Sequence, residues 1–152
     1  MRKTERQIKD RAAIDAVIRQ SQVCRLGLAD GDTPYIVPLC FGYDGSRLYF
    51  HCAAEGRKVD VLRRNPTVCV EFDAVHGLVS ADNACGWTIR YHSVIGTDRA
   101  VIVSDPDEKR RGLALIMAQY ASGTFTFPEA AVARTTVLRV TLDSLTGKQS
   151  AP

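Results

Sequence analysis

The segment from His51 to Lys58 carries the residues best suited to chemistry in this chain of 152 residues. Gly56, Arg57 and Lys58 follow a predicted strand and stand at the start of a predicted helix. The first N–H groups of a helix and the positive end of its dipole attract an anion, and two cations strengthen that attraction. The combination suits a phosphate group. The alternative is that Arg57 and Lys58 are solvated helix residues with no ligand.

The strand before this helix also carries a histidine on the face away from the core. Period-2 alternation puts Leu48, Phe50 and Cys52 on one apolar face. His51 therefore points the other way, towards solvent, a pocket or a partner subunit.

A second segment, 86–96, combines aromatic and polar side chains. Trp87 and Ser93 alternate onto one face, which can stack on a flat ring and hydrogen-bond to it. The other face carries Arg90 and His92, which can donate to anionic or carbonyl oxygens. An edge strand with one core face and one wet face would show the same pattern.

Other common sites are missing from the sequence. There is no glycine-rich phosphate loop of the GxGxxG or GxxxxGK[ST] type, no GxSxG elbow and no HExxH pattern. His51, His76 and His92 are too scattered to indicate a metal site, and we expect His76 on a surface loop. The sequence therefore predicts no bound metal.

Charge and cysteine content narrow the functional class further. Lys and Arg number 20 against 17 Asp and Glu, and a net charge of +3 is too small to indicate nucleic-acid binding. The five cysteines form no CxxC pair and no Cys/His cluster. Four lie in apolar runs, which predicts buried, reduced thiols: Cys24, Cys40, Cys52 and Cys69.

The N-terminal sequence MRKTERQIKDR has no apolar segment typical of a signal peptide, and no stretch has the length of a membrane span. We therefore expect a soluble, cytoplasmic protein that binds neither membranes nor nucleic acid.

The elements that position these segments form one predicted domain, 1–152. Helical spacing indicates helices over 4–20, 57–65 and 105–120, and residues 74–85 and 122–128 are expected to be loops. Strands are predicted at 23–29, 34–43, 47–53, 67–73 and 136–145, with two more between 87 and 103 joined by a kink near Gly96. Because a repeating βαβ order is absent, we expect an α+β fold that is mainly antiparallel: a closed or nearly closed β-barrel with peripheral helices.

Taken in order, the segments of this chain resemble the FMN-binding split-barrel superfamily related to pyridoxamine 5′-phosphate oxidase. Within it, the chain is most similar to the nitroimidazole-resistance (Nim-type) group. The segments that carry the resemblance are PYIVPLCFGYDG (34–45), LYFHCAAEGRK (48–58), RRNP (63–66), CGWTIRYHSVIG (85–96), EKRRGLALIMAQY (108–120) and LTGK (145–148).

The resemblance implies a homodimeric, six-stranded split barrel with FMN at the subunit interface. The strand matching Ile36 to Leu39 would lie along the flavin ring, and the Gly56–Lys58 equivalent would hold the phosphate. The strand matching Trp87 to Ser93 would add contacts, often from the partner subunit. The implied cofactor-binding residues are Val37, Pro38, Leu39, His51, Cys52, Ala53, Gly56, Arg57, Lys58, Trp87, Arg90 and Ser93.

The resemblance also implies a nitroreductase-like, FMN-dependent oxidoreductase that acts on a small molecule, with His51 as the catalytic residue. An imidazole of ordinary pKa, about 6.5, suits proton transfer near neutrality. Two alternatives stay open: a non-catalytic flavin or haem binder, and a deazaflavin-dependent reductase. Asp98 stands where relatives often carry a glycine, which affects the expected bulge geometry but not the pocket. The C-terminal substrate motif of pyridoxamine 5′-phosphate oxidase is absent, so we do not expect pyridoxamine oxidation.

Overall fold

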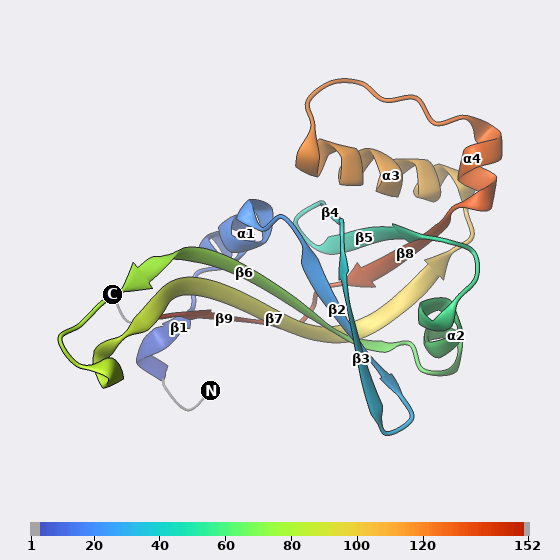
Figure 1. Ribbon diagram of the computed structural model, residues 1–152. Helices are drawn as coiled ribbons and strands as arrows, with labels where there is room; N and C mark the ends of the chain where they lie inside the picture. The colour runs from blue at the N-terminus through green and yellow to red at the C-terminus, as the bar shows by residue number, and fades with distance from the viewer. Residues whose placement is uncertain (1–3, 151–152) are drawn as a thin grey trace.

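The computed structural model describes residues 4–150 (Figure 1). The helices are α1 (Arg11–Gln20), α2 (Arg57–Arg64), α3 (Pro106–Tyr120) and α4 (Glu129–Arg134), with short 3-10 turns η1 (Thr4–Arg6) and η2 (Ala84–Gly86). The strands are β1 (Gln7–Ile8), β2 (Cys24–Asp30), β3 (Thr33–Leu39), β4 (Gly42–Tyr43), β5 (Arg47–Cys52), β6 (Thr67–Val79), β7 (Thr88–Val103), β8 (Thr136–Thr141) and β9 (Leu145–Gln149).

The strands form an antiparallel sheet that closes on itself. Its order is β3-β2-β6-β7-β8-β5-β4, and β3 and β4 are two halves of one bent segment. That segment pairs with β2 before the bend and with β5 after it, so the ring has six strands. The α+β, mainly antiparallel six-stranded split barrel is therefore confirmed. Two small strands lie outside the ring: β9 pairs with β7, and β1 pairs with β9.

Alternating residues of the ring fill its interior, as the sequence pattern predicts. Cys24, Leu26 and Leu28 of β2 are buried. Phe41 and Phe72, both fully buried, meet edge to face with ring centroids 5.0 Å apart. Edge-to-face aromatic pairs add to the stabilisation from burial alone. The barrel is thus a packed core with no open lumen.

Helix α3 covers the outside of β4 and β5, so β5 is buried on both faces. Tyr49, on the face opposite Leu48 and Phe50, is fully buried. Its hydroxyl donates to Glu108 Oε1 at 3.2 Å, and Arg139 donates to the same oxygen at 2.7 Å. Burial alone would raise the pKa of Glu108, but hydrogen bonds from Arg139 and Tyr49 lower it. The carboxylate stays ionised and ties α3 to the sheet.

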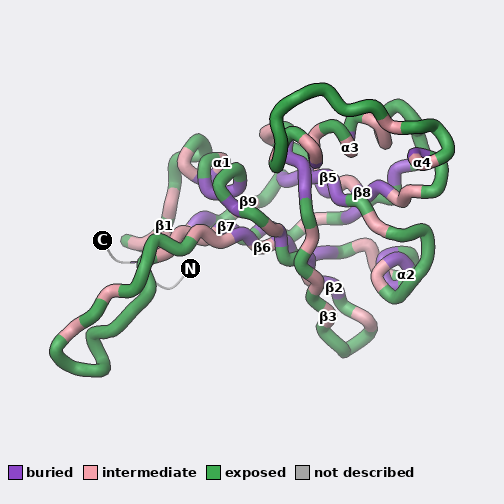
Figure 2. Tube along the Cα trace, turned by 45° about the horizontal axis from the view of Figure 1, so that its top comes forward, coloured by how far each residue is buried: buried purple, intermediate pink, exposed green. Residues whose placement is uncertain are grey.

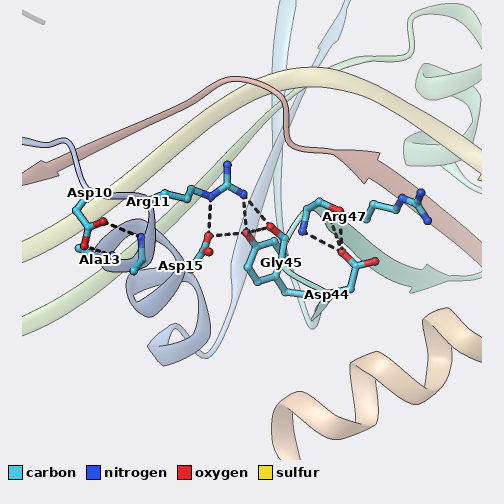
Figure 3. A network of polar contacts seen from close by, with 10 residues as sticks. Asp10, Arg11, Ala13, Asp15, Asp44, Gly45 and Arg47 are labelled. Atoms are coloured by element: carbon cyan, nitrogen blue, oxygen red, sulfur yellow. Dashed lines mark hydrogen bonds and ion pairs between the residues drawn. The ribbon is translucent and has the colours of Figure 1, made fainter.

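Helix α1 is fastened to the β4–β5 turn by a compact polar network (Figure 3). Arg11 donates to Asp15 at 2.9 Å, to the Tyr43 hydroxyl at 3.0 Å and to the Gly45 carbonyl at 2.8 Å. The Tyr43 hydroxyl also lies 2.7 Å from Asp15 Oδ1. Burial and this carboxylate raise the pKa of Tyr43 to about 12, so the phenol remains protonated and can donate.

The predicted helix over 4–20 is wrong in its first half. The helix begins only at Arg11, because Asp10 caps it there and accepts hydrogen bonds from the N–H groups of Ala12 and Ala13. Residues 7 and 8 instead pair with β9. The predicted final strand over 136–145 ends earlier, at Thr141, and β9 begins separately at Leu145.

The predicted loop over 74–85 and the predicted break near Gly96 are also wrong. β6 continues to Val79, and β7 is one strand from Thr88 to Val103. The irregularity lies in β6, where the register shifts between Val75 and Gly77. The two strands form a long hairpin whose outer part is exposed and projects from the barrel (Figure 2).

Three of the four cysteines expected to be buried are not fully buried. Cys24 lies in the core, Cys52 is half-buried, and Cys40 and Cys69 are exposed because their side chains alternate onto the outer faces of their segments. All five cysteines are free. Over residues 4–150, no helix is both long enough and apolar enough to cross a bilayer.

Replacing Gly42 by alanine tests whether close packing of α3 maintains the ring. A Cβ at this position would lie 2.4 Å from the Ile116 nitrogen and 2.5 Å from the Leu115 carbonyl carbon, both backbone atoms that cannot rotate away. We expect Gly42→Ala to lower the free energy of unfolding by about 2–3 kcal/mol in urea denaturation. As a control, Gly31→Asn places a side chain in open space at φ +61°, a conformation that asparagine tolerates, and should cost less than about 1 kcal/mol. Equal losses in the two variants would contradict this account.

Candidate functional site

The end of β5 leads into an unusual helix start. Gly56, the residue before α2, has φ +123° and supplies no capping side chain. By contrast, Asp10 and Asp105 cap α1 and α3 with carboxylates. A side chain at Gly56 would be conformationally strained, and the first N–H groups of α2 are left without a side-chain acceptor. This helix end can therefore accept an external anion.

A cavity of about 210 Å³ opens at this helix start. It brings together five residues predicted to bind the cofactor: Cys52, Ala53, Gly56, Arg57 and Lys58. Tyr35, Glu55 and Val59 complete the lining. Residues from β3, β5 and α2 thus meet at one place, as the sequence predicted for the β5–α2 part of the site.

Arg57 is held in place by the β2–β3 hairpin. Its guanidinium lies 4.5 Å from the centroid of the Tyr35 ring, and its Nε lies 3.3 Å from Asp30 Oδ2. The other Asp30 oxygen accepts from Arg64 at 2.7 Å. The hydrogen bond from Arg64, assisted by Arg57, lowers the pKa of Asp30. An exposed ion pair contributes little stability, so its main effect here is to orient Arg57.

Lys58 differs from Arg57 in having no such partner. The residue is half-buried, and no carboxylate of residues 4–150 lies within 4.0 Å of its ammonium group. Its charge acts on the neighbouring Cys52, whose pKa burial raises and Lys58 partly lowers. Cys52 is therefore a neutral thiol at pH 7, and the Lys58 ammonium group in the cavity is not in an ion pair with any carboxylate of residues 4–150.

The β3 residues predicted to contact the flavin ring lie on two different faces of the strand. Val37 and Leu39 pack against the barrel core, whereas Pro38 is exposed. Ile36, on the same outer face as Pro38, is 65% exposed. Ile36 also lines an apolar cavity of about 310 Å³ over β2, β3, β6 and β7. A flat apolar ligand could contact this outer face, but not Val37 and Leu39 from the same side.

His51 is exposed at the end of β5, where it pairs across the sheet with Val137. Its position directly before Cys52 agrees with the predicted orientation away from the core. Nothing in the fold covers this imidazole, so it is accessible to a small molecule.

The remaining predicted cofactor-binding residues do not lie near the α2 cavity within one chain. Trp87, Arg90 and Ser93 lie along the projecting β6–β7 hairpin, at the opposite end of the molecule from α2 (Figure 1). Trp87 is half-exposed, and its indole N–H donates to the Ala81 carbonyl at 2.8 Å. One chain therefore contains two separate groups of predicted cofactor-binding residues.

Sequence reasoning missed two residues of the site, Asp30 and Tyr35. They lie on either side of the β2–β3 turn, far from Arg57 in the chain, and no local spacing links them to it. The Asp30–Thr33 pairing that brings them close was predictable as a hairpin. Their contact with α2 depends on how that hairpin packs beside the helix, which is a tertiary arrangement.

Comparison with known proteins gives the family. The family described as "Pyridoxamine 5'-phosphate oxidase" matches residues 10–149. A solved structure from Bacteroides thetaiotaomicron VPI-5482, described as a candidate 5-nitroimidazole antibiotic resistance protein, is 35% identical with a TM-score of 0.86. The match covers 94% of this chain and 86% of that one.

More distant solved structures share the fold. The FAD and haem binding protein from Mycobacterium smegmatis is 20% identical with a TM-score of 0.89, covering 97% of this chain and 74% of that one. The flavocytochrome Anf3 from Azotobacter vinelandii is 21% identical with a TM-score of 0.85, covering 96% and 70%. Among curated proteins, the uncharacterized protein RA0666 of Rhizobium meliloti (strain 1021) is 33% identical over 64 residues, 42% of each chain. From the family match over residues 10–149, this chain belongs to the pyridoxamine 5′-phosphate oxidase family.

Proposed function

We propose that this protein is a homodimeric, FMN-dependent oxidoreductase that acts on a small molecule, with nitro compounds as the leading substrate class. The observation that carries the proposal is the uncapped start of α2, where Gly56, Arg57 and Lys58 share a cavity with Tyr35. Membership of the pyridoxamine 5′-phosphate oxidase family supports flavin as the ligand. The five free cysteines fit a location in the reducing cytoplasm.

The residues at α2 have the chemistry that the phosphate of FMN requires. Backbone N–H groups of the first helical turn, the Arg57 guanidinium and the Lys58 ammonium are all donors. Because Gly56 has no Cβ, an anion can approach the backbone closely. Arg57 is oriented in advance by Asp30 and Tyr35, so less conformational entropy is lost when it binds. Lys58 supplies a charge that no carboxylate of residues 4–150 pairs with.

A second copy of the chain would complete the site. The accessible surface of the chain is 9053 Å², whereas a compact monomer of this mass exposes about 7,600 Å². Part of the excess is apolar, including Ile36, Ile89 and Ile95. We propose that the partner's hairpin brings Trp87, Arg90 and Ser93 to the ring of a flavin whose phosphate is held by α2.

In this arrangement, FMN supplies the electron-transfer chemistry and the protein supplies binding, orientation and protons. The exposed outer face of β3, with Ile36 and Pro38, would lie against the ring. His51, one residue before the cavity-lining Cys52, would hold or deliver a proton at the substrate atom being reduced.

The relative from Bacteroides thetaiotaomicron supports nitroimidazoles as the first substrates to test, since its description names resistance to 5-nitroimidazole antibiotics. The FAD and haem binding protein from Mycobacterium smegmatis and the flavocytochrome from Azotobacter vinelandii are the reason to test a second function, that of a non-catalytic flavin or haem carrier. The absorbance spectrum of the purified protein separates a flavin from a haem or a deazaflavin. A haem band with no flavin band would overturn the proposal.

The double variant Arg57→Ala/Lys58→Ala tests the phosphate site. We expect FMN to bind about 10- to 100-fold more weakly, because charge-assisted hydrogen bonds to the phosphate are lost. Riboflavin, which lacks the phosphate, should bind nearly as before. Fluorescence titration of both ligands measures the two affinities.

Arg63→Ala is the matched control, since Arg63 lies on the same helix but outside the cavity lining, where it pairs with Asp60 at 3.7 Å. It should leave both affinities unchanged. An equal loss of FMN and riboflavin affinity in the double variant would indicate damage to the fold and argue against a phosphate site.

His51→Gln tests the proton-transfer role. The holoprotein is reduced anaerobically and mixed with a 5-nitroimidazole, and the return of oxidised flavin absorbance is followed. We expect the variant to be about 100-fold slower while it retains its flavin. Arg47→Gln, at the other end of β5 and also exposed, should react at the wild-type rate. If the wild-type protein itself shows no reoxidation by the nitro compound, the carrier function is favoured.

Ile36→Asp tests the dimer. A carboxylate buried without a partner at the interface costs several kcal/mol, so we expect a monomer in light scattering and loss of FMN. Phe125→Asp is the control: Phe125 is 38% exposed but lies in the loop that follows α3. A dimer that keeps its flavin after Ile36→Asp would place the interface elsewhere.

A further inference from the structure

Two histidines that are far apart in the sequence meet at the base of the β6–β7 hairpin. His76 lies in β6 at the register shift between Val75 and Gly77, and Gly77 has φ +121°. His92 lies in β7 opposite Ala74. The shift leaves His76 unpaired in the ladder, and such bulges commonly redirect a side chain. The prediction that the histidines are scattered is therefore wrong for this pair, and His76 is in a strand rather than a loop.

The two imidazoles approach each other through their nitrogens. His76 Nε2 lies 3.2 Å from His92 Nδ1, with ring centroids 4.6 Å apart. Two imidazole nitrogens on one tetrahedral cation, each about 2.05 Å from the metal, lie about 3.3 Å apart. The two nitrogens share a hydrogen bond, and their separation is also that of two ligands on one metal ion, so an ion would take the place of the shared proton.

The surroundings leave room for a bound ion. His76 and His92 line a cavity of about 270 Å³ beneath α1, together with Gln20 of α1 and Gln149 of β9. Gln149 pairs directly with His92 across the sheet. Both glutamines carry amide oxygens that can act as further ligands, and the cavity also has space for water.

The pair is also open to solvent. His76 is exposed, so an ion can reach the two rings from outside.

We propose that His76 and His92 form a binding site for a divalent late transition-metal ion, of which Zn²⁺ is the representative. Imidazole ligands select Zn²⁺, Cu²⁺ and Ni²⁺ over Mg²⁺ and Ca²⁺, which prefer oxygen. Residues 4–150 contain no group of three or more His, Cys, Asp or Glu side chains that could hold a metal. The site therefore has two protein nitrogens, with water or a glutamine oxygen in the remaining positions, and its ion is exchangeable.

Bound metal would join β6 to β7 where the hairpin leaves the barrel, close to α1. The site is separate from the cavity at α2, and the inference does not rest on flavin binding or on turnover.

The test is an NMR titration of the imidazole resonances with ZnCl₂. The chain has three histidines, so each ring can be assigned by substitution. We expect the resonances of His76 and His92 to shift together in one saturable step, while those of His51 stay in place. This readout excludes zinc bound to the exposed thiols of Cys40, Cys69 and Cys85, because it follows only the rings. MgCl₂ should shift none of the three.

Substitution then separates a shared site from two independent ligands. In His76→Gln, the His92 resonances should need at least about tenfold more Zn²⁺ to shift, since even outer partners of metal ligands contribute 10- to 100-fold in affinity. His92→Gln should weaken the response of His76 by the same factor. His51→Gln is the matched control and should leave both responses unchanged. The proposal is overturned if the wild-type pair does not shift, if all three rings shift alike, or if either ring responds normally without the other. The wild-type titration decides the first two even where a variant fails to fold.

Discussion

The bend at Cys40 and Phe41 is the constraint on which the rest of this structure depends. One segment, β3 with β4, must pair with β2 on one side of the bend and with β5 on the other. At the bend its backbone leaves both ladders, and a buried N–H without a partner would be costly. The Phe41 N–H donates to the Tyr120 hydroxyl at 3.1 Å, and that hydroxyl donates to the Gln22 carbonyl at 2.8 Å. Closure of the ring therefore requires the end of α3.

This dependence on α3 explains why β5 is rigid enough to carry a site. Because α3 must approach β4 closely, as the contacts around Gly42 show, it also covers the outer face of β5. Tyr49 is buried there against a helix, and Leu48 and Phe50 are buried against the core. A strand fixed on both faces delivers Cys52 and the start of α2 at a defined position. The β2–β3 hairpin then orients Arg57, so the groups proposed to bind the phosphate are already in place.

The sequence predicted this architecture well where the signals were local. Alternation located β2, β5 and β8, and Asp105 with Pro106 marked the start of α3. The prediction failed where pairing between distant strands overrides local composition. Residues 74–79 have the composition of a loop, yet they extend β6 because twelve residues of β7 supply pairing partners for that strand. At the site, Gly56, Arg57 and Lys58 were predictable because they are neighbours in the chain. Asp30, Tyr35 and the His76–His92 contact were not, because each depends on a register or a packing angle that no single segment specifies.

The same bend accounts for an exposed apolar face of the chain. After β3 parts from β4, the outer face of β3 has no helix over it, and Ile36 is left in solvent. The long β6–β7 hairpin extends in the other direction, with Leu78, Trp87 and Ile89 exposed, which is more apolar surface than a soluble hairpin normally presents. The fold therefore covers the outer face of β5 with its own helix and leaves that of β3 exposed. In the proposed function the flavin would lie between these two surfaces, because α2 would hold its phosphate and a second chain would supply the aromatic wall.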